Sequence, residues 1–188
     1  RTATEVGYPV VLKMMSPLLA HKTEAGAVAL NLTDADAVAS ALIQMTADVT
    51  AHNPKAVTDK FLVEAMSPAP LAELIVTLRS DPQFGAALVL GSGGILVELV
   101  GDAVTLLLPA TPDDIVRALN QLRAAPLLEG FRGRSKANTQ KIATQLYQLC
   151  TAYLKDQTAI VEIEINPLFV YPDQICAVDA LLHRAGDK

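Results

Sequence analysis

The sequence lacks tryptophan, has two cysteines in 188 residues and contains only 4% aromatic residues. Its net charge is −5, and no run of basic residues occurs. Nucleic-acid binding needs a positive surface and gains from aromatic stacking, so this composition argues against a nucleic-acid partner. Neither a GxxxxGK[ST] phosphate loop nor a GxGxxG fingerprint is present, which excludes two common nucleotide-binding loops.

The two cysteines, Cys150 and Cys176, are far apart and form no CxxC pair, so no zinc or redox motif is visible. Two separate thiols fit a reducing compartment, and we expect a cytoplasmic protein without a signal peptide. The most apolar stretch is 86–110, but Glu98, Asp102 and several glycines and prolines interrupt it. It predicts two buried strands joined by a glycine loop rather than a membrane span.

Hydrophobic residues make up 51% of the chain, which is enough for a substantial core. Alternating and helical patterns predict strands at 8–14, 25–32, 58–66, 72–79, 86–90 and 104–108, and helices at 34–52, 112–122 and 138–154; residues 95–99 are expected to lead out of the glycine loop. Thr33 and Thr111 are the expected N-caps, and 127–134 is expected to be a loop. The pattern predicts an α+β or layered α/β protein.

The segment Ser67-Pro68-Ala69-Pro70 is a stiff linker, typical of the connection between two lobes. We therefore expect a first lobe at residues 1–66 and a second at 67–188. Residues 1–7 resemble the tail of a helix that ends at Gly7, so the first lobe is expected to be incomplete and the chain to be part of a longer protein.

A β-hairpin is predicted near the end of the chain, from residues 161–168, 171–174 and 175–181. Glu162, Glu164 and Asn166 alternate with β-branched residues, and Asp179 lies on the return strand. The oxygen-bearing side chains of Glu164, Asn166 and Asp179 are hard ligands that suit Mg²⁺. The alternative is a solvated face on an edge strand, because Pro167 cannot donate a hydrogen bond in a central strand.

Four charged residues could contact a nucleotide. Lys13 ends an apolar strand and must reach either water or an anion such as phosphate. His21, in a polar loop beside Lys22, could act as a nucleophile toward phosphorus, although an exposed loop histidine is the simpler reading. Glu64 and Glu73, on either side of the proline linker, could meet adenine and ribose or be solvated strand ends.

Backbone and arginine groups offer two further anion sites. The loop Gly91-Ser92-Gly93-Gly94 presents uncovered backbone N–H groups, and a tight turn between strands would explain the same glycines. Arg132 and Arg134 could bind phosphate or carboxylate, or simply form a solvated basic loop.

Six short motifs occur together in a fixed order. They are Tyr8-Pro9-Val10-Val11-Leu12-Lys13, Ser16-Pro17, His21-Lys22-Thr23-Glu24, Asp81-Pro82-Gln83-Phe84-Gly85, Gly91-Ser92-Gly93-Gly94-Ile95-Leu96-Val97-Glu98 and Glu164-Ile165-Asn166-Pro167-Leu168. This set resembles the ATP-grasp domain of the ADP-forming (NDP-forming) acyl-CoA synthetases, which include acetyl-CoA synthetase β subunits and are related to the succinyl-CoA synthetase β subunit. The resemblance covers nearly the whole chain.

The resemblance implies two lobes, each with a β-sheet packed by helices, that bind ATP or ADP with Mg²⁺. It implies a phosphate-contacting role for Lys13 and an adenine-holding hinge at Glu64. It also implies that Asn166 and Asp179 are metal ligands, and that Glu164 is the first residue of a Glu-x-Asn pair. The remaining nucleotide-site residues on this reading are Glu73, Gly93 and Gly94, and His21 is the candidate phosphoryl carrier.

The reaction implied by the resemblance converts acid, CoA and ATP reversibly into acyl-CoA, ADP and phosphate through an acyl phosphate and a phosphohistidine. The expected partners are CoA-binding and CoA-ligase domains of the same protein or of another subunit; oligomerisation stays open, and no membrane partner is expected. One departure is Gly26-Ala27, where the family usually has two glycines after the His-Lys segment. Without the partner domains, the chain is expected to bind nucleotide but make no acyl-CoA.

Two alternatives remain open at this point. A degenerate ATP-grasp region of a protein lysine acetyltransferase could sense a ligand without transferring phosphate. An ATP-grasp carboxylate–amine ligase is a further candidate, but the His21-Lys22-Thr23 segment favours the phosphohistidine branch. Retention of Lys13, His21, Asn166 and Asp179 together favours the synthetase over the acetyltransferase, because a degenerate domain has no need of all four.

Overall fold

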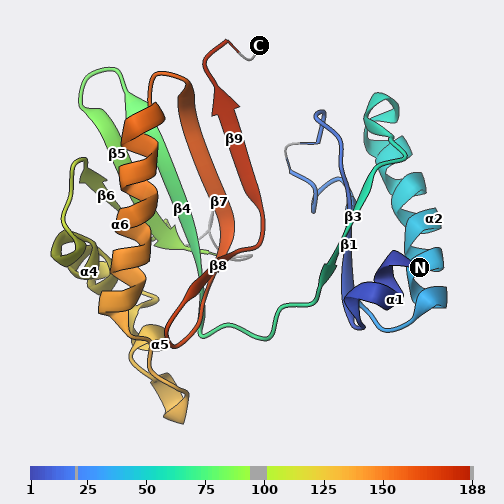
Figure 1. Cartoon of the computed structure of the whole chain (residues 1–188), viewed down its shortest axis with the longest axis horizontal. Coiled ribbons are helices and arrows are strands. Elements are labelled where there is room, and N and C mark those ends of the chain that lie inside the picture. Colours follow the sequence, from blue (N-terminus) through green and yellow to red (C-terminus); the bar gives the residue numbers. More distant parts are fainter. Residues whose placement is uncertain (20, 94–100, 187–188) are drawn as a thin grey trace. The chain divides into compact units, whose positions relative to one another are not determined.

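The computed structural model describes residues 1–19, 21–93 and 101–186 (Figure 1). The chain forms two compact units, Arg1–Pro68 and Ala69–Lys188, each with its own hydrophobic cluster. The division falls in the proline-containing linker, whereas the sequence placed the boundary at about residue 67.

The first unit is a three-stranded antiparallel sheet with helices. Its elements are α1 (Thr2–Val6), β1 (Val10–Met14), β2 (Val28–Leu32), α2 (Ala35–His52), η1 (Pro54–Ala56) and β3 (Phe61–Ala65). The strand order β2-β1-β3 makes β1 central, and Met45 and Val49 of α2 belong to the same core as Leu12 and Met14. The expected cap of α2 was wrong by one residue, because the carboxylate of Asp34 accepts the N–H of Ala37 at 2.8 Å.

The second unit is a six-stranded sheet with helices. Its elements are β4 (Ala72–Asp81), β5 (Gly85–Ser92), β6 (Ala103–Leu107), α4 (Pro112–Gln121), α5 (Ala125–Leu128), η2 (Phe131–Gly133), α6 (Thr139–Asp156), β7 (Ile160–Val170), β8 (Ile175–Ala177) and β9 (Ala180–Arg184). The order is β6-β5-β4-β7-β8, with β9 also paired to β7. Every recorded pairing is antiparallel, so the fold is α+β.

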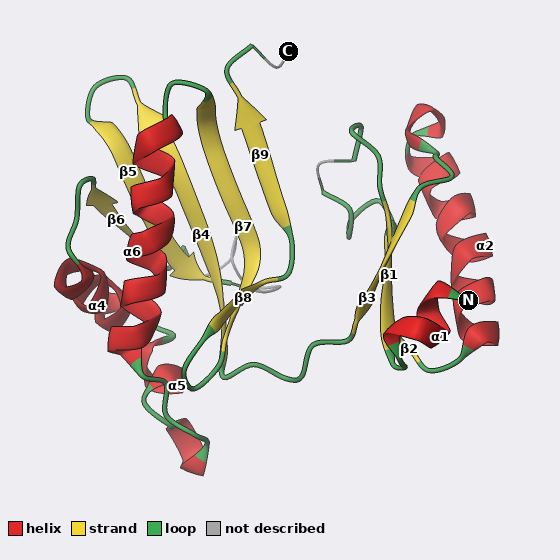
Figure 2. Ribbon diagram, in the orientation of Figure 1, coloured by secondary structure: helices red, strands yellow, loops and turns green. Residues whose placement is uncertain are grey.

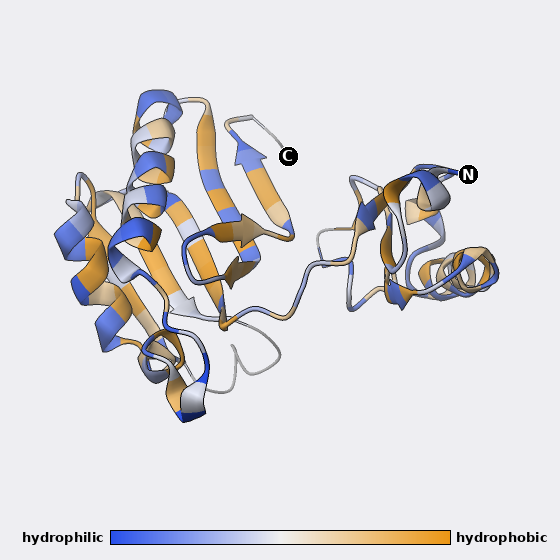
Figure 3. Cartoon of the chain, turned by 60° about the horizontal axis from the view of Figure 1, so that its bottom comes forward, coloured by the Kyte–Doolittle hydropathy of each residue, from blue (hydrophilic) through white to orange (hydrophobic). Residues whose placement is uncertain are grey.

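Helices α4 and α6 lie on the same face of this sheet (Figure 2). Alternate residues of β4, such as Leu74, Val76 and Leu78, share a core with Leu119 of α4 and Leu146 of α6. Figure 3 shows that the strands under these helices are mainly hydrophobic, whereas the helices carry hydrophilic stretches as well. The described part of the chain places no helix on the opposite face, which we call the open face.

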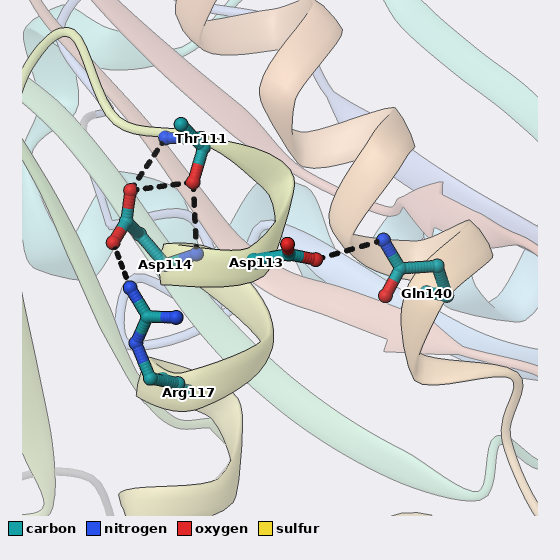
Figure 4. Close-up of polar contacts among 5 residues, drawn as sticks. All are labelled: Thr111, Asp113, Asp114, Arg117 and Gln140. Atoms are coloured by element: carbon teal, nitrogen blue, oxygen red, sulfur yellow. Dashed lines mark hydrogen bonds and ion pairs between the residues drawn. The ribbon is translucent and has the colours of Figure 1, made fainter.

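The start of α4 confirms the expected cap at Thr111 (Figure 4). Thr111 Oγ1 accepts the N–H of Asp114 at 3.2 Å, and the Asp114 carboxylate accepts the N–H of Thr111 at 2.8 Å. The hydroxyl and backbone hydrogen bonds from Thr111 hold the pKa of Asp114 below its ordinary value, and Arg117 adds an ion pair. Asp113 accepts a hydrogen bond from Gln140 at 3.3 Å and so ties α4 to α6.

Two further expectations were wrong. Residues 127–134 are not a continuous loop, because α5 and η2 lie in and beside them, and α5 is too short to show helical periodicity in the sequence. The return strand of the hairpin is not continuous either, since β8 and β9 are separated at residues 178–179. Residues 95–99, expected to lead out of the glycine loop, lie outside the described residues. Among the described helices, none is long and apolar enough to cross a membrane.

The two thiols should differ sharply in reactivity. Cys150 is buried, and burial raises its pKa from 9.0 to about 11, whereas Cys176 is partly exposed. At pH 8, one equivalent of a maleimide should therefore label Cys176, and Cys150 should react only after unfolding. Because the folded-state pKa of Cys150 is raised, its contribution to stability is complete below pH 9 and is lost as the pH rises toward 11. Mass spectrometry of the labelled peptides tests this, and early labelling of Cys150 would contradict it.

Candidate functional site

A β-bulge in β7 shapes the end of the predicted hairpin. Leu74 of β4 pairs with Leu168 and Val76 pairs with Ile165, so Asn166 and Pro167 together face the single residue between them on β4. Strict alternation would place Leu168 on the same face as Glu164, yet Ile165 and Leu168 are both buried. The bulge thus lets both segments of β7 face the core, and it lets a central strand accept Pro167, contrary to the edge-strand alternative.

The bulge brings Asn166 next to Asp179, as the metal-site prediction requires. The N–H of Asn166 donates to the carbonyl oxygen of Asp179 at 3.1 Å, and the N–H of Val178 donates to the carbonyl of Pro167 at 3.1 Å. These bonds fix the break between β8 and β9 against the bulge. Asp179 Oδ1 also accepts the N–H of Ala180 at 3.1 Å, which holds the start of the carboxylate side chain.

Glu164 lies along the same strand on the open face. It pairs with Thr77 of β4 and Leu181 of β9, and Glu162 pairs one row further with Arg79 and His183. Paired residues share one face of a sheet, and the helix-covered face carries the buried Ile165 and the partly buried Ile163. Glu164 and Glu162 thus lie on the same face, and Glu164 is the nearer of the two to Asn166 along the strand. It remains the third candidate ligand.

This donor set fits Mg²⁺. The described ranges contain no cluster of three or more His, Cys, Asp or Glu side chains arranged for a metal. One amide oxygen and one or two carboxylates from Asn166, Asp179 and Glu164 match the few protein ligands that Mg²⁺ uses when water and phosphate oxygens complete its shell.

Glu73 and Gly93 are joined at the base of the glycine-rich segment. The N–H of Gly93 donates to the carbonyl of Glu73 at 2.7 Å. A Cβ at Gly93 would lie 2.7 Å from the carbonyl carbon of Leu74 and 2.8 Å from its nitrogen, so the close approach to β4 requires glycine. The N–H of Gly93 is already bonded to Glu73 and is not available to a phosphate. Gly93 can contribute to a nucleotide site only by allowing the chain to lie close to β4. Gly94 lies outside the described residues.

Asp102 was not among the predicted site residues, but the structure places it at the base of the same segment. Its carboxylate accepts hydrogen bonds from the Ser92 hydroxyl and from the N–H of Arg123 at 2.8 Å, and the N–H of Ser92 donates to its carbonyl at 3.0 Å. Burial acts to raise the pKa of Asp102, but hydrogen bonds from Ser92, Arg123 and Ala124 outweigh it and lower the pKa. The only hint of this contact in the sequence was that Ser92 and Asp102 lie on either side of the glycine-rich segment.

In the first unit, the structure brings Lys13 and Glu64 together. Lys13 is only 5% exposed, and its Nζ lies 2.6 Å from Oε2 of Glu64. Lys13 is therefore not a snorkelling surface lysine. Glu64, expected at the nucleotide hinge, forms an ion pair with the expected phosphate ligand.

His21 is exposed in the connection between β1 and β2. Its carbonyl accepts the N–H of Ala25 at 3.4 Å, which helps to turn this loop back toward β2. Within the described residues of this unit, no hydrogen bond or ion pair joins the His21 side chain to Lys13 or Glu64. Gly26, with a φ of 67°, packs so closely on Asp48 of α2 that a Cβ would lie 2.7 Å from the aspartate Cβ. Its conformation and this packing both require glycine.

Arg134 also has a structural contact. Its guanidinium donates to the carbonyl of Pro70 at 2.5 Å, so it holds the start of the second unit rather than being only a solvated charge. Arg132 lies over the ring of Phe131 at 5.2 Å from its centroid. Neither contact gives further support to the anion-binding role that the sequence allowed for these arginines.

A family model described as an ATP-grasp domain matches residues 1–183. The chain is 35% identical over 176 residues to the beta subunit of acetate–CoA ligase [ADP-forming] I from Pyrococcus furiosus, covering 94% of this chain and 75% of that subunit. It is 33% identical to acetate–CoA ligase [ADP-forming] I of Archaeoglobus fulgidus, but spans only 25% of that longer protein. These relatives are ligases and give no support to the acetyltransferase alternative.

A solved structure is similar over almost the whole chain. It is the dinucleotide forming acetyl-coenzyme A synthetase 1 of Ca. Korarchaeum cryptofilum in complex with coenzyme A, Ca-AMPCP and HgCl⁺, with a TM-score of 0.89 and 33% identity over 98% of this chain and 80% of that one. The same synthetase with coenzyme A and Mg-AMPPCP, described as having its phosphohistidine segment pointing towards the nucleotide binding site, has a TM-score of 0.79 and 30% identity, covering 98% of this chain and 80% of that one. The chain belongs to the ATP-grasp domain family and is a homologue of the beta subunits of ADP-forming acetate–CoA ligases.

Proposed function

We propose that this chain is the ATP-binding part of an ADP-forming acyl-CoA synthetase. Such an enzyme converts a carboxylic acid, CoA and ATP reversibly into acyl-CoA, ADP and phosphate, through an acyl phosphate and a phosphohistidine. The observation that carries the proposal is the backbone hydrogen bond from Asn166 to Asp179, which makes these two proposed ligands neighbours at a bulge. The family match and the nucleotide-bound relatives support the same reading.

Each predicted residue has a distinct part in this proposal. Asn166 and Asp179, with Glu164 beside them, would hold Mg²⁺, which neutralises charge on the transferring phosphoryl group. Lys13 supplies a fixed positive charge for phosphate oxygens. His21, exposed on its loop, is the proposed phosphoryl carrier, and its exposure leaves it open to attack by or on a phosphoryl group.

The partner parts of the enzyme belong to the proposal as well. The relatives include separate beta subunits and single-chain ligases about four times the length that this chain spans in them. We place CoA and the carboxylic acid on CoA-binding and CoA-ligase domains in the same protein or in another subunit. The 188-residue chain incubated with acetate, CoA and Mg·ATP should therefore form no acyl-CoA, and robust turnover would contradict this division of labour.

Nucleotide binding can be tested directly by thermal unfolding. At a concentration 100 times its dissociation constant, Mg·ADP should stabilise the chain by about 2.7 kcal/mol, and ADP with EDTA should stabilise it less. Differential scanning fluorimetry with adenosine as the control measures both effects. An unchanged midpoint with millimolar Mg·ADP would refute the proposed function.

The partly exposed thiol offers an independent readout. Cys176 pairs with Phe169, and Phe169 pairs with Glu73, so the three share one row on the open face. Maleimide labelling of Cys176 should slow when Mg·ADP binds, whereas adding CoA alone should leave the rate unchanged. Buried Cys150 serves as the internal reference for unfolding.

A further inference from the structure

The buried ammonium group of Lys13 is an unusual feature of the first unit. Lys13 lies on the central strand β1, opposite Val28 of β2 and Leu62 of β3. It is the only charged residue among the described residues that is buried, at 5% exposure. A buried ammonium is costly unless an anion neutralises it, so the site demands a negative partner whether or not nucleotide is bound.

Glu64 meets this demand from the neighbouring strand. Val11 pairs with Glu64 while Lys13 pairs with Leu62, so Lys13 and Glu64 are diagonal neighbours on one face of the sheet. Nζ and Oε2 are 2.6 Å apart. Oε2 is buried although the Glu64 side chain as a whole is 40% exposed. A carboxylate oxygen thus lies against the ammonium, which is the location that a phosphate oxygen would take.

We infer that Glu64 is a positioning residue that acts through Lys13 rather than a ligand of the adenine base. The inference rests on the proposed function, in which Lys13 binds phosphate. Glu64 holds Nζ in place when no nucleotide is bound, and its negative charge opposes an incoming polyphosphate. The ion pair therefore lowers the affinity of Lys13 for anions while it stabilises the ligand-free fold, and it makes nucleotide binding sensitive to the number of phosphates.

The substitution Glu64→Gln distinguishes a positioning role through Lys13 from a role as an adenine ligand. It keeps the size of the side chain and an oxygen acceptor for Lys13, but it removes the negative charge. Isothermal titration without Mg²⁺ should show ADP and tripolyphosphate binding about tenfold more tightly to the variant, the order expected when one like charge is removed beside a polyanion. Adenosine affinity should not change. An equal loss of adenosine and ADP affinity would overturn the inference, because it would show a base contact.

A matched control is available in the same unit. Glu5 is an exposed glutamate whose Oε1 lies 3.1 Å from Nε of Arg1. Glu5→Gln makes the same change of charge and should leave ADP and tripolyphosphate affinity within twofold of the wild type. A tenfold gain in this control as well would overturn the inference, since it would reflect net charge alone.

The thermal stability of the ligand-free protein tests the Lys13–Glu64 ion pair independently of nucleotide binding. Glu64→Gln and Lys13→Met should each lower the thermal midpoint, and the double variant should lose less than the sum of the two, because removing both charges leaves neither buried alone. Additive losses would overturn the inference. If the wild type binds no Mg·ADP, the proposed function fails, yet Glu64→Gln should still gain tripolyphosphate binding and the two midpoints should still be coupled.

Discussion

Replacing Asp179 with alanine should abolish the Mg²⁺-dependent part of the stabilisation by ADP. The carboxylate is the charged member of the proposed ligand pair, while the backbone carbonyl that accepts the Asn166 N–H is kept in the variant. At a nucleotide concentration 100 times the wild-type dissociation constant, Mg·ADP should stabilise the wild type by about 2.7 kcal/mol in total. The variant should lose nearly all of the part of this stabilisation that disappears when EDTA removes Mg²⁺. Thermal unfolding with and without EDTA measures it.

The turn of the same hairpin provides the control for this experiment. Asp173 carries the same charge, is exposed and forms an ion pair with Lys141 at 2.8 Å. Asp173→Ala should keep the whole Mg²⁺ effect, with at most a small loss of stability typical of an exposed ion pair. If Asp179→Ala behaves like this control, the metal assignment is wrong, and Glu164 becomes the carboxylate to test next.

The second large effect is expected at Gly93. A valine side chain there would place Cβ 2.7 Å from the backbone of Leu74, which cannot move away as a flexible side chain could. The variant must separate β5 from β4 and weaken the bond from Gly93 to the Glu73 carbonyl, at a cost of about 3 kcal/mol. Urea unfolding should show this loss, and Mg·ADP affinity should fall with it because Glu73 shifts.

Gly133 is the comparison glycine for that measurement. It has a φ of 78°, but nothing lies within 4 Å of the Cβ that a side chain would add. Gly133→Ala should therefore cost only the left-handed backbone penalty of about 1 kcal/mol and should not affect nucleotide affinity. If Gly93→Val is no more destabilising than this control, the close approach of the chain to β4 does not require glycine.

The sequence pattern predicted the hairpin of the candidate metal site but not the bulge within it. The alternation around Glu164 and Asn166 predicted the hairpin, because apolar side chains at two-residue spacing must face a core. The bulge at Pro167 was not predictable in the same way. A bulge is defined by which residues of β4 pair with β7, and that pairing is not visible in the alternation along β7 itself. The predicted hairpin and the motif resemblance both pointed to Asp179.

Local signals decided some element boundaries and misled on others. The capping box at Thr111 is complete within four residues, so the sequence contained all of it. Two adjacent residues with suitable side chains compete at the start of α2, and Asp34 rather than Thr33 is the cap, because its carboxylate accepts the N–H of Ala37.

By itself, the sequence determined the two-lobed α+β arrangement, the closing hairpin and the family to which the chain belongs. Those features depend on spacing along the chain and on which side chains avoid water. Only the tertiary structure decided that Glu64 pairs with Lys13, that Gly93 donates to Glu73 and that Asn166 lies against Asp179. Each of these contacts depends on strand register, and register is set by the packing of distant segments rather than by the residues on either side.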